Sequence, residues 1–115
     1  MTQAERRRHP RIPVCLPLRL TLQDDTVDTV IINLSETGIR LRMPRPMQLL
    51  SRVQIGIELP ETKGLTPASV AITGVIVRCE PTEDAEIPFD TAIFFEDLSD
   101  SARGSISRFI SAQLA

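Results

Sequence analysis

The chain has 115 residues, 42% of them hydrophobic, and a formal net charge of −2 at pH 7. This length fits one domain with a real core, and the acidic balance argues against a general nucleic-acid coat. No run approaches the ~18 apolar residues of a membrane-spanning helix, and no leader sequence precedes the domain, so we expect a cytoplasmic protein without a membrane span.

The first feature in chain order is a basic segment, which we treat as an arm over residues 1–12 ahead of a single domain over residues 13–115. A basic terminal run is usually a solvated tail. Arginine, however, carries five N–H donors in a flat fork that fits a phosphate or the edge of a guanine. The arginines of the arm are Arg6, Arg7, Arg8 and Arg11.

Six stretches of the domain predict β-strands. The first, third and fourth alternate apolar and polar residues with period two, as half-buried strands do, and the second is rich in β-branched residues. Pro17 suggests an edge or a bulge in the first strand, and Gly74 suggests a bend or a bulge in the fifth. The expected strands cover residues 14–22, 27–32, 39–43, 52–59, 69–79 and 91–95.

The end of the chain has helical periodicity instead. Ser99 is a suitable N-cap for a helix over about residues 99–114, and Asp100 favours its first turn. The apolar face of this helix consists of Ile106, Phe109, Ile110 and Leu114, and we expect it to pack on its own domain. Six short strands and one terminal helix predict an all-β fold, a small six-stranded antiparallel barrel with a C-terminal α-helix.

The sequence gives no sign of catalysis. It contains no nucleophile–base pair, no paired acids in apolar surroundings, no P-loop and no cluster of metal ligands. Cys15 and Cys79 do not have a metal or redox spacing, so we expect reduced core or strand residues. We therefore expect a protein that is not an enzyme and that holds no cofactor or metal.

The polar turn over residues 33–38 is the second candidate feature. Asn33 can start a turn, Ser35 can cap it, and Gly38 can supply a positive φ, so a purely structural role explains the turn. The same amide, hydroxyl and bare backbone also suit a ribose, a phosphate or a base edge. Both interpretations are open for the turn taken alone.

Together, the arm and the turn resemble the PilZ domain family of bacterial receptors for cyclic di-GMP. Arg7-Arg8-His9-Pro10-Arg11 is similar to the family's Arg-x-x-x-Arg motif, and Asn33-Leu34-Ser35-Glu36-Thr37-Gly38 is similar to its Asp/Asn-x-Ser-x-x-Gly motif. The resemblance spans nearly the whole chain and implies the same barrel with a C-terminal helix. Ala92 falls near a position where many members carry glycine.

The resemblance implies a stand-alone receptor for cyclic di-GMP that acts on an unidentified downstream protein. It implies that Arg7 and Arg11 bind guanine edges and phosphates, and that Asn33 and Ser35 bond a base or the sugar-phosphate. Gly38 would let the backbone approach the ligand. The ligand is expected to order the arm and so to change the surface of the protein.

Arg6 stands immediately before the arginine motif. The resemblance implies that an arginine there favours two stacked ligand molecules per chain, with Arg8 as a further cation. A PilZ-like adaptor that binds no nucleotide is the main alternative. A nucleic-acid binder fits less well, because the body of the chain is acidic and lacks exposed aromatic residues.

Overall fold

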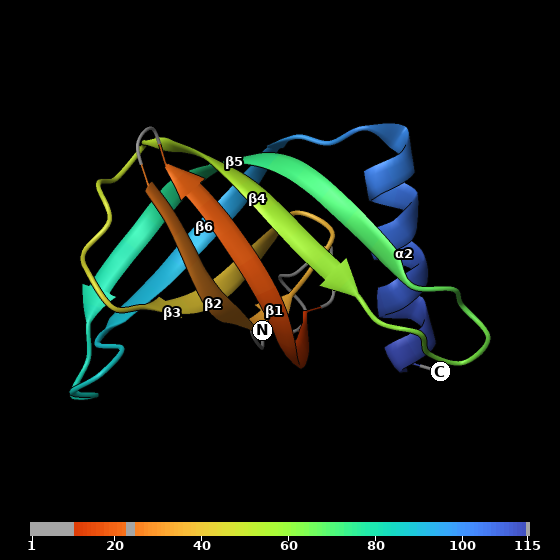
Figure 1. Ribbon diagram of the computed structural model, residues 1–115, viewed down its shortest axis with the longest axis horizontal. Helices are drawn as coiled ribbons and strands as arrows, with labels where there is room; N and C mark the ends of the chain where they lie inside the picture. Colours follow the sequence, from red (N-terminus) through yellow and green to blue (C-terminus); the bar gives the residue numbers. More distant parts are fainter. Residues whose placement is uncertain (1–10, 23–24, 115) are drawn as a thin grey trace, which may run out of the picture.

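Six antiparallel strands close into a barrel in the computed structural model, which describes residues 11–22 and 25–114 (Figure 1). The strand order around the barrel is β1-β2-β3-β6-β5-β4, and one helix follows the last strand. The predicted fold class is therefore confirmed. The elements are β1 (Ile12–Leu22), β2 (Asp25–Leu34), β3 (Gly38–Met43), β4 (Arg52–Leu59), β5 (Ala68–Pro81), β6 (Phe89–Asp97) and α2 (Asp100–Leu114).

The period-two pattern of the sequence puts one face of each strand inside the barrel. Leu18 and Leu20 of β1 are buried, and the residues between and beside them are exposed. In β4, Val53, Ile55 and Ile57 are likewise buried, and the residues between and beside them are exposed or half-buried. Burial of such side chains contributes roughly 1.5–3 kcal/mol each, and this core positions the outward residues of every strand.

Local irregularities bend the strands without opening the barrel. The register shifts between Thr73 and Gly74, which confirms the bulge predicted there. A side chain at Gly74 would lie 2.5 Å from Cγ2 of Ile93, so only glycine fits without a shift. The irregularity of β1 lies between Pro13 and Leu16 rather than at Pro17 itself.

Pro17 is also not on an open edge, because β1 pairs with a strand on each side. It precedes the residues of β1 that pair with β4, which begin at Leu18. The missing N–H of Pro17 therefore costs that ladder no hydrogen bond.

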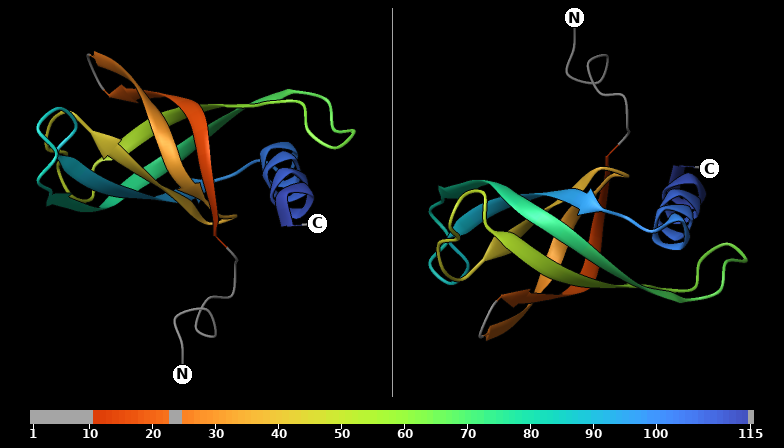
Figure 2. Two further views of the ribbon diagram at one scale, coloured as in Figure 1. Left: turned by 90° about the horizontal axis from the view of Figure 1, so that it is seen from below. Right: turned by 90° about the horizontal axis from the view of Figure 1, so that it is seen from above.

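The helix α2 lies beside one end of the barrel, next to the connection between β4 and β5 (Figures 1 and 2). The predicted cap is confirmed, since Oγ of Ser99 accepts a hydrogen bond from the backbone N–H of Ala102 at 3.1 Å. Ile106, Phe109 and Ile110 are buried as expected. Leu114 is instead 59% exposed, because the helix ends there beyond its contact with the barrel.

Within residues 11–22 and 25–114, no helix is long and apolar enough to cross a membrane.

Candidate functional site

The two sequence motifs meet where β1 and β2 pair. Ile12 lies opposite Leu34 and Pro13 lies opposite Asn33, so the end of the basic arm runs alongside the polar turn (Figure 2). Arg11 donates a hydrogen bond from Nη1 to Oδ1 of Asn33 at 3.2 Å. Residues 22 positions apart in sequence thus form one polar contact on the outside of the barrel.

The turn between β2 and β3 is built around Ser35, which is only 1% exposed. Its Oγ accepts hydrogen bonds from the backbone N–H groups of Thr37 and Gly38, each at 3.2 Å. Its own N–H donates to the carbonyl of Gly38 at 3.0 Å. Ser35 therefore shapes the turn from inside, whatever further contact it makes with a ligand.

Gly38 is required by the neighbouring strand. A Cβ at this position would lie 2.5 Å from the backbone oxygen of Ile93 on β6, far inside contact distance. The positive φ expected for Gly38 is wrong, because Gly64 is the one glycine with a positive φ among residues 11–22 and 25–114. The absent side chain thus lets β3 and β6 approach each other at the end of the turn.

A row of outward-facing residues continues from Asn33 across the next three strands. Asn33 pairs with Arg40 on β3, Arg40 with Ala92 on β6, and Ala92 with Arg78 on β5. Directly opposed residues in a sheet share a face, so these four side chains lie side by side. Phe94, two residues after Ala92 on β6, is 52% exposed.

Asp90 links the two arginines of this row. Arg40 donates from Nε to Oδ1 and from Nη2 to Oδ2 of Asp90, both at 2.8 Å, and Arg78 donates from Nη2 to Oδ2 at 3.5 Å. Hydrogen bonding from Arg40 is the main reason that the pKa of Asp90 lies below its ordinary value, although burial opposes this shift. Asp90 therefore stays charged at neutral pH and fixes the Arg40 guanidinium.

Arg40, Arg78 and Asp90 were not among the site residues predicted from the sequence. Alternation in the predicted strand over residues 39–43 already placed Arg40 outside the barrel. This position was the one sequence feature that could have indicated Arg40 as a site residue. Nothing in the sequence indicated Asp90, which lies 50 positions from Arg40. Among the predicted site residues, the structure brings together Arg11, Asn33, Ser35 and Gly38, and Arg6, Arg7 and Arg8 lie outside the described residues.

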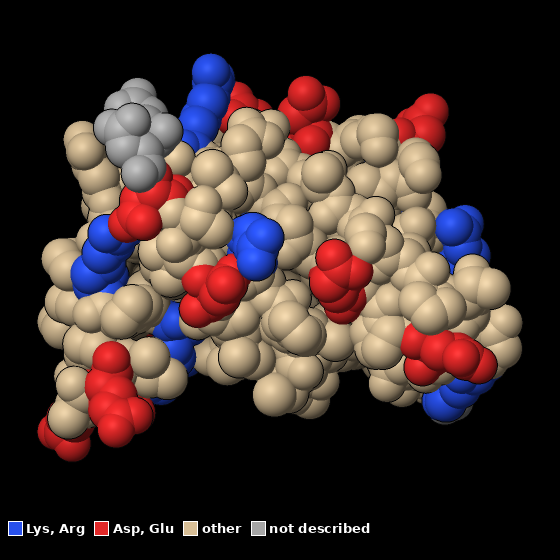
Figure 3. Space-filling view, in the orientation of Figure 1, with Lys and Arg blue, Asp and Glu red and all other residues tan. Residues whose placement is uncertain are grey.

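Elsewhere on the barrel, described ion pairs join one arginine to one carboxylate. On the face shown in Figure 3, acidic and basic side chains are interspersed over a mostly neutral surface. Both described cysteines are free thiols, and the described residues contain no group of acids, histidines and cysteines able to hold a metal ion. The separate pairs are Arg19–Asp28, Arg45–Asp25 and Arg52–Glu96.

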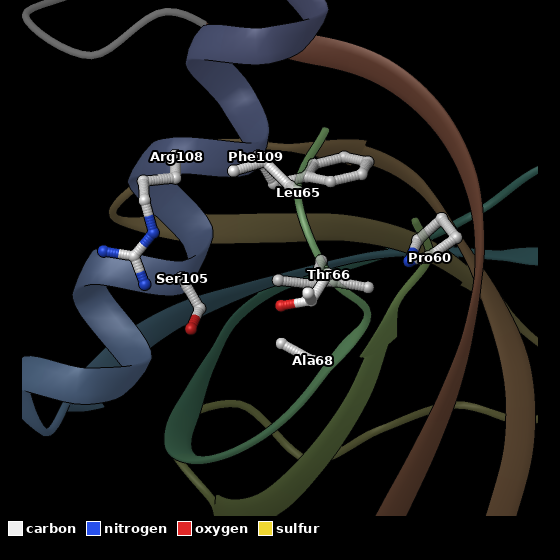
Figure 4. Close-up of a pocket in the computed structure, with 8 residues that line it drawn as sticks. Pro60, Leu65, Thr66, Ala68, Ser105, Arg108 and Phe109 are labelled. Carbon is white, nitrogen blue, oxygen red and sulfur yellow. The ribbon is translucent and has the colours of Figure 1, made fainter. Parts of the chain in front are cut away.

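A small cavity of about 120 Å³ lies between α2 and the connection from β4 to β5 (Figure 4). Ser105, Arg108 and Phe109 line it from the helix, and Leu65 and Thr66 line it from the connection. None of its lining residues belongs to either motif or to the row from Asn33 to Arg78.

These features define a small closed β-barrel with a polar site on its outer face, where Arg11 contacts Asn33 beside the turn between β2 and β3. The model of the PilZ domain matches residues 5–112. The chain therefore belongs to the PilZ domain family. A search of curated proteins gives no significant match.

Solved structures support the fold. MotI/DgrA, an inhibitor of motility from Bacillus subtilis, superposes with a TM-score of 0.80 at 18% identity, over 95% of this chain and 52% of its own. Escherichia coli YcgR in complex with c-di-GMP gives 0.76 at 17% identity, over 95% of this chain and 46% of its own.

The PilZ domain of the same YcgR protein, also with c-di-GMP, gives a TM-score of 0.71 at 17% identity, over 95% of this chain and 92% of that one. The chain thus spans about half the length of the MotI and longer YcgR chains and nearly all of the separate PilZ domain. At these identities, the likeness establishes the fold.

Proposed function

We propose that this chain is a receptor for cyclic di-GMP, a cytoplasmic stand-alone adaptor without chemistry of its own. The hydrogen bond from Arg11 to Asn33 carries the proposal, because it joins the two motifs on one outer face of a PilZ barrel. Two of the similar structures are YcgR proteins with c-di-GMP. The proposed ligand has two phosphates and two guanines, which suit arginine forks.

The arm and the turn make different contacts with the ligand. Arg7 and Arg11 bind guanine edges and phosphates, and Asn33 bonds a base or the sugar-phosphate. Ser35 and Gly38 contribute through the turn, which Ser35 holds by hydrogen bonds from two backbone N–H groups. Since a bidentate arginine–guanine pair gives roughly 1–3 kcal/mol and micromolar affinity needs about 8 kcal/mol, several contacts must act together.

We also propose that the ligand orders the arm. Fixing six residues costs on the order of 6–12 kcal/mol of backbone entropy, and four like charges repel one another when they are gathered. A dianionic ligand offsets both terms with charge-assisted hydrogen bonds. The ordered arm creates a new surface for the downstream protein. Arg6 and Arg8 add the charge for a second stacked molecule, so we expect two ligands per chain.

Isothermal titration calorimetry with cyclic di-GMP and cyclic di-AMP tests the proposal. We expect micromolar or tighter binding of cyclic di-GMP, saturation at two ligands per chain, and loss of binding in Arg7→Ala. Arg19→Ala is the matched control, because Arg19 is an exposed arginine of β1 that pairs with Asp28 away from the arm.

Absence of heat at tens of micromolar protein, or equal binding of both dinucleotides, would overturn the receptor and favour the adaptor that binds no nucleotide. Saturation at one ligand per chain contradicts only the stoichiometry. In that case, Arg6→Leu should leave binding unchanged.

A further inference from the structure

We propose that Arg40 and Arg78 form a second phosphate-binding subsite for the cyclic dinucleotide, on the outer face of β3, β6 and β5. This inference rests on the proposed function, and it adds residues that belong to neither motif. It follows from the positions of the two guanidinium groups, their remaining donors and the single carboxylate that they share.

The position of the two arginines continues the motif site. Both lie in the row that starts at Asn33, with the small side chain of Ala92 between them. Three interstrand spacings of about 4.8 Å place the strand of Arg78 at most about 14 Å from that of Asn33. A ligand anchored at Asn33 that extends along this row meets Arg40 first and Arg78 next.

Both guanidinium groups keep N–H donors for a ligand. Asp90 takes the Nε and one Nη2 hydrogen of Arg40, which leaves three of five donors. Arg78 gives Asp90 a single contact of 3.5 Å. The side chains of Arg40 and Arg78 are 37% and 43% exposed, so part of each guanidinium group is accessible from the outer face, although Nε of Arg78 is buried.

The ion pairs of Arg40 and Arg78 occupy only some of their N–H donors. Asp90 is a single carboxylate with a side chain only 12% exposed, and it serves both Arg40 and Arg78. A third arginine, Arg42, lies directly opposite Asp90 on β3. The Nε atoms of Arg42 and Arg78 are buried without a hydrogen-bond partner. Unlike the one-to-one ion pairs elsewhere, this cluster pairs two arginines with one carboxylate, and Glu80 on β5 lies opposite Asp90 on its other side.

A phosphate matches this chemistry better than a base does. The edge of Arg40 that carries Nε and Nη2 already binds a carboxylate, which fixes the plane of the guanidinium. The other edge of the Arg40 guanidinium is therefore held in a fixed orientation beside a second cation, Arg78. Two cations on either side of Ala92 suit a phosphate, whose negative charge is shared among several oxygens. Phosphate contacts position a ligand without reading its base.

Calorimetry with cyclic di-GMP on the full chain tests the subsite with four variants. Arg78→Ala removes one cation and one long contact. Arg40→Ala/Asp90→Ala removes one positive and one negative charge, so its net charge equals that of the wild type. The matched controls are Arg52→Ala and Arg52→Ala/Glu96→Ala, since Arg52 and Glu96 form a comparable two-bond pair at 2.9 and 2.8 Å. Thermal unfolding of every variant checks the fold.

We expect Arg78→Ala and Arg40→Ala/Asp90→Ala to bind about tenfold more weakly or worse, and the Arg52 variants to bind like the wild type. The loss in Arg78→Ala should shrink as salt is raised, because the lost attraction is screened. Wild-type affinity in folded Arg78→Ala and Arg40→Ala/Asp90→Ala overturns the subsite but leaves the receptor intact. No binding by the wild type overturns the receptor and, with it, the subsite.

A base contact would give a different result. If Arg78→Ala narrowed the preference of the chain for cyclic di-GMP over cyclic di-AMP, the subsite would read a base and the phosphate assignment would be wrong. An unchanged preference with weaker binding supports the phosphate.

Discussion

Arg11 holds the side chain of Asn33 through a hydrogen bond of 3.2 Å between Nη1 and Oδ1. One partner is the last arginine of the basic arm, and the other is the first residue of the polar turn. The contact follows from the register of β1 against β2, which sets Pro13 opposite Asn33. Two motifs that are separate in sequence are therefore parts of one surface.

This contact predicts that binding and stability can be separated. Arg11→Ala and Asn33→Ala should each weaken cyclic di-GMP binding by about tenfold or more, because each variant removes a group that we propose contacts the ligand. The pair is exposed, so the free energy of unfolding should change by less than about 1 kcal/mol. Calorimetry and urea unfolding measure the two effects. A large loss of stability with intact binding would assign the contact to the fold alone.

Ordering of the arm predicts a change in amide exchange. Residues 2–10, which precede Arg11 and the first strand, should exchange rapidly without cyclic di-GMP and become protected when it is added, while β4 and β5 keep the same protection in both states. Arg7→Ala should remove the added protection with little change in thermal stability of the free chain. Hydrogen–deuterium exchange with mass spectrometry is the measurement. An arm already protected without ligand refutes the switch and indicates a preformed pocket.

The hydroxyl of Ser35 predicts a cost to the fold. Ser35→Ala removes the acceptor of the backbone N–H groups of Thr37 and Gly38 inside a buried turn. Unfolding by urea should show a loss of about 1–3 kcal/mol, the usual cost of buried groups without a partner. Ser51→Ala is a suitable control, because its hydroxyl donates to Gln48 in an exposed loop. Equal stability of the two variants would contradict this role of Ser35.

The close contact at Gly38 predicts that a side chain there destabilises the fold, and Gly56 provides the control. In Gly38→Ala, the new Cβ would meet the backbone oxygen of Ile93 at 2.5 Å, whereas in Gly56→Ala the nearest atom lies at 3.8 Å. We expect Gly38→Ala to lower the free energy of unfolding by about 1–3 kcal/mol through overpacking. Gly56→Ala should be neutral or slightly stabilising. Denaturant unfolding compares them, and similar losses in both would argue against the close approach of β3 and β6.

Asp90 predicts a pH dependence. Hydrogen bonds from Arg40 lower the folded pKa of Asp90, so the unfolded chain takes up this proton first as pH falls. The stabilisation is complete above the unfolded pKa of about 3.9 and is lost as pH falls through the lower folded value. Asp90→Asn should therefore be less stable than the wild type at pH 7 by about 1–3 kcal/mol.

The difference between wild type and Asp90→Asn should shrink below about pH 4. Urea unfolding of both proteins from pH 7 down to pH 2 measures this difference in the free energy of unfolding. Glu96→Gln is the control, because its pair with Arg52 lies in an exposed position and should contribute little at any pH. A stability difference that persists unchanged at the lowest pH would be inconsistent with the ion pair as its cause.

Local patterns predicted most of the fold. All six strands were predicted, three of them from alternation; Gly74 marked a real bulge, and Ser99 caps the helix. The errors lie at the ends of elements, where pairing with a neighbour decides the outcome. Asn33 looked like the start of a turn but lies within β2, which runs to Leu34, because Asn33 pairs with Arg40.

The candidate site was harder to predict, because its residues converge from distant strands. The motifs indicated Asn33, Ser35 and Gly38, but no local signal showed that Gly38 faces the carbonyl of Ile93. Arg40 and Asp90 are 50 positions apart, and their pairing depends on which strands become neighbours in the closed barrel. Such a contact is a property of topology, which a single sequence specifies only indirectly.

The distance in sequence between the site residues also links ligand binding to folding. Arg11 meets Asn33, and Arg40 meets Asp90, only when β1, β2, β3 and β6 are assembled. An unfolded chain therefore has no equivalent of the site. A ligand that binds the site binds only the folded chain, so it shifts the folding equilibrium toward the folded state by mass action. At a free concentration one hundred times its dissociation constant, a single bound ligand adds about 2.7 kcal/mol to the free energy of unfolding. If cyclic di-GMP binds as proposed, the melting temperature of the barrel should therefore rise with the free concentration of cyclic di-GMP.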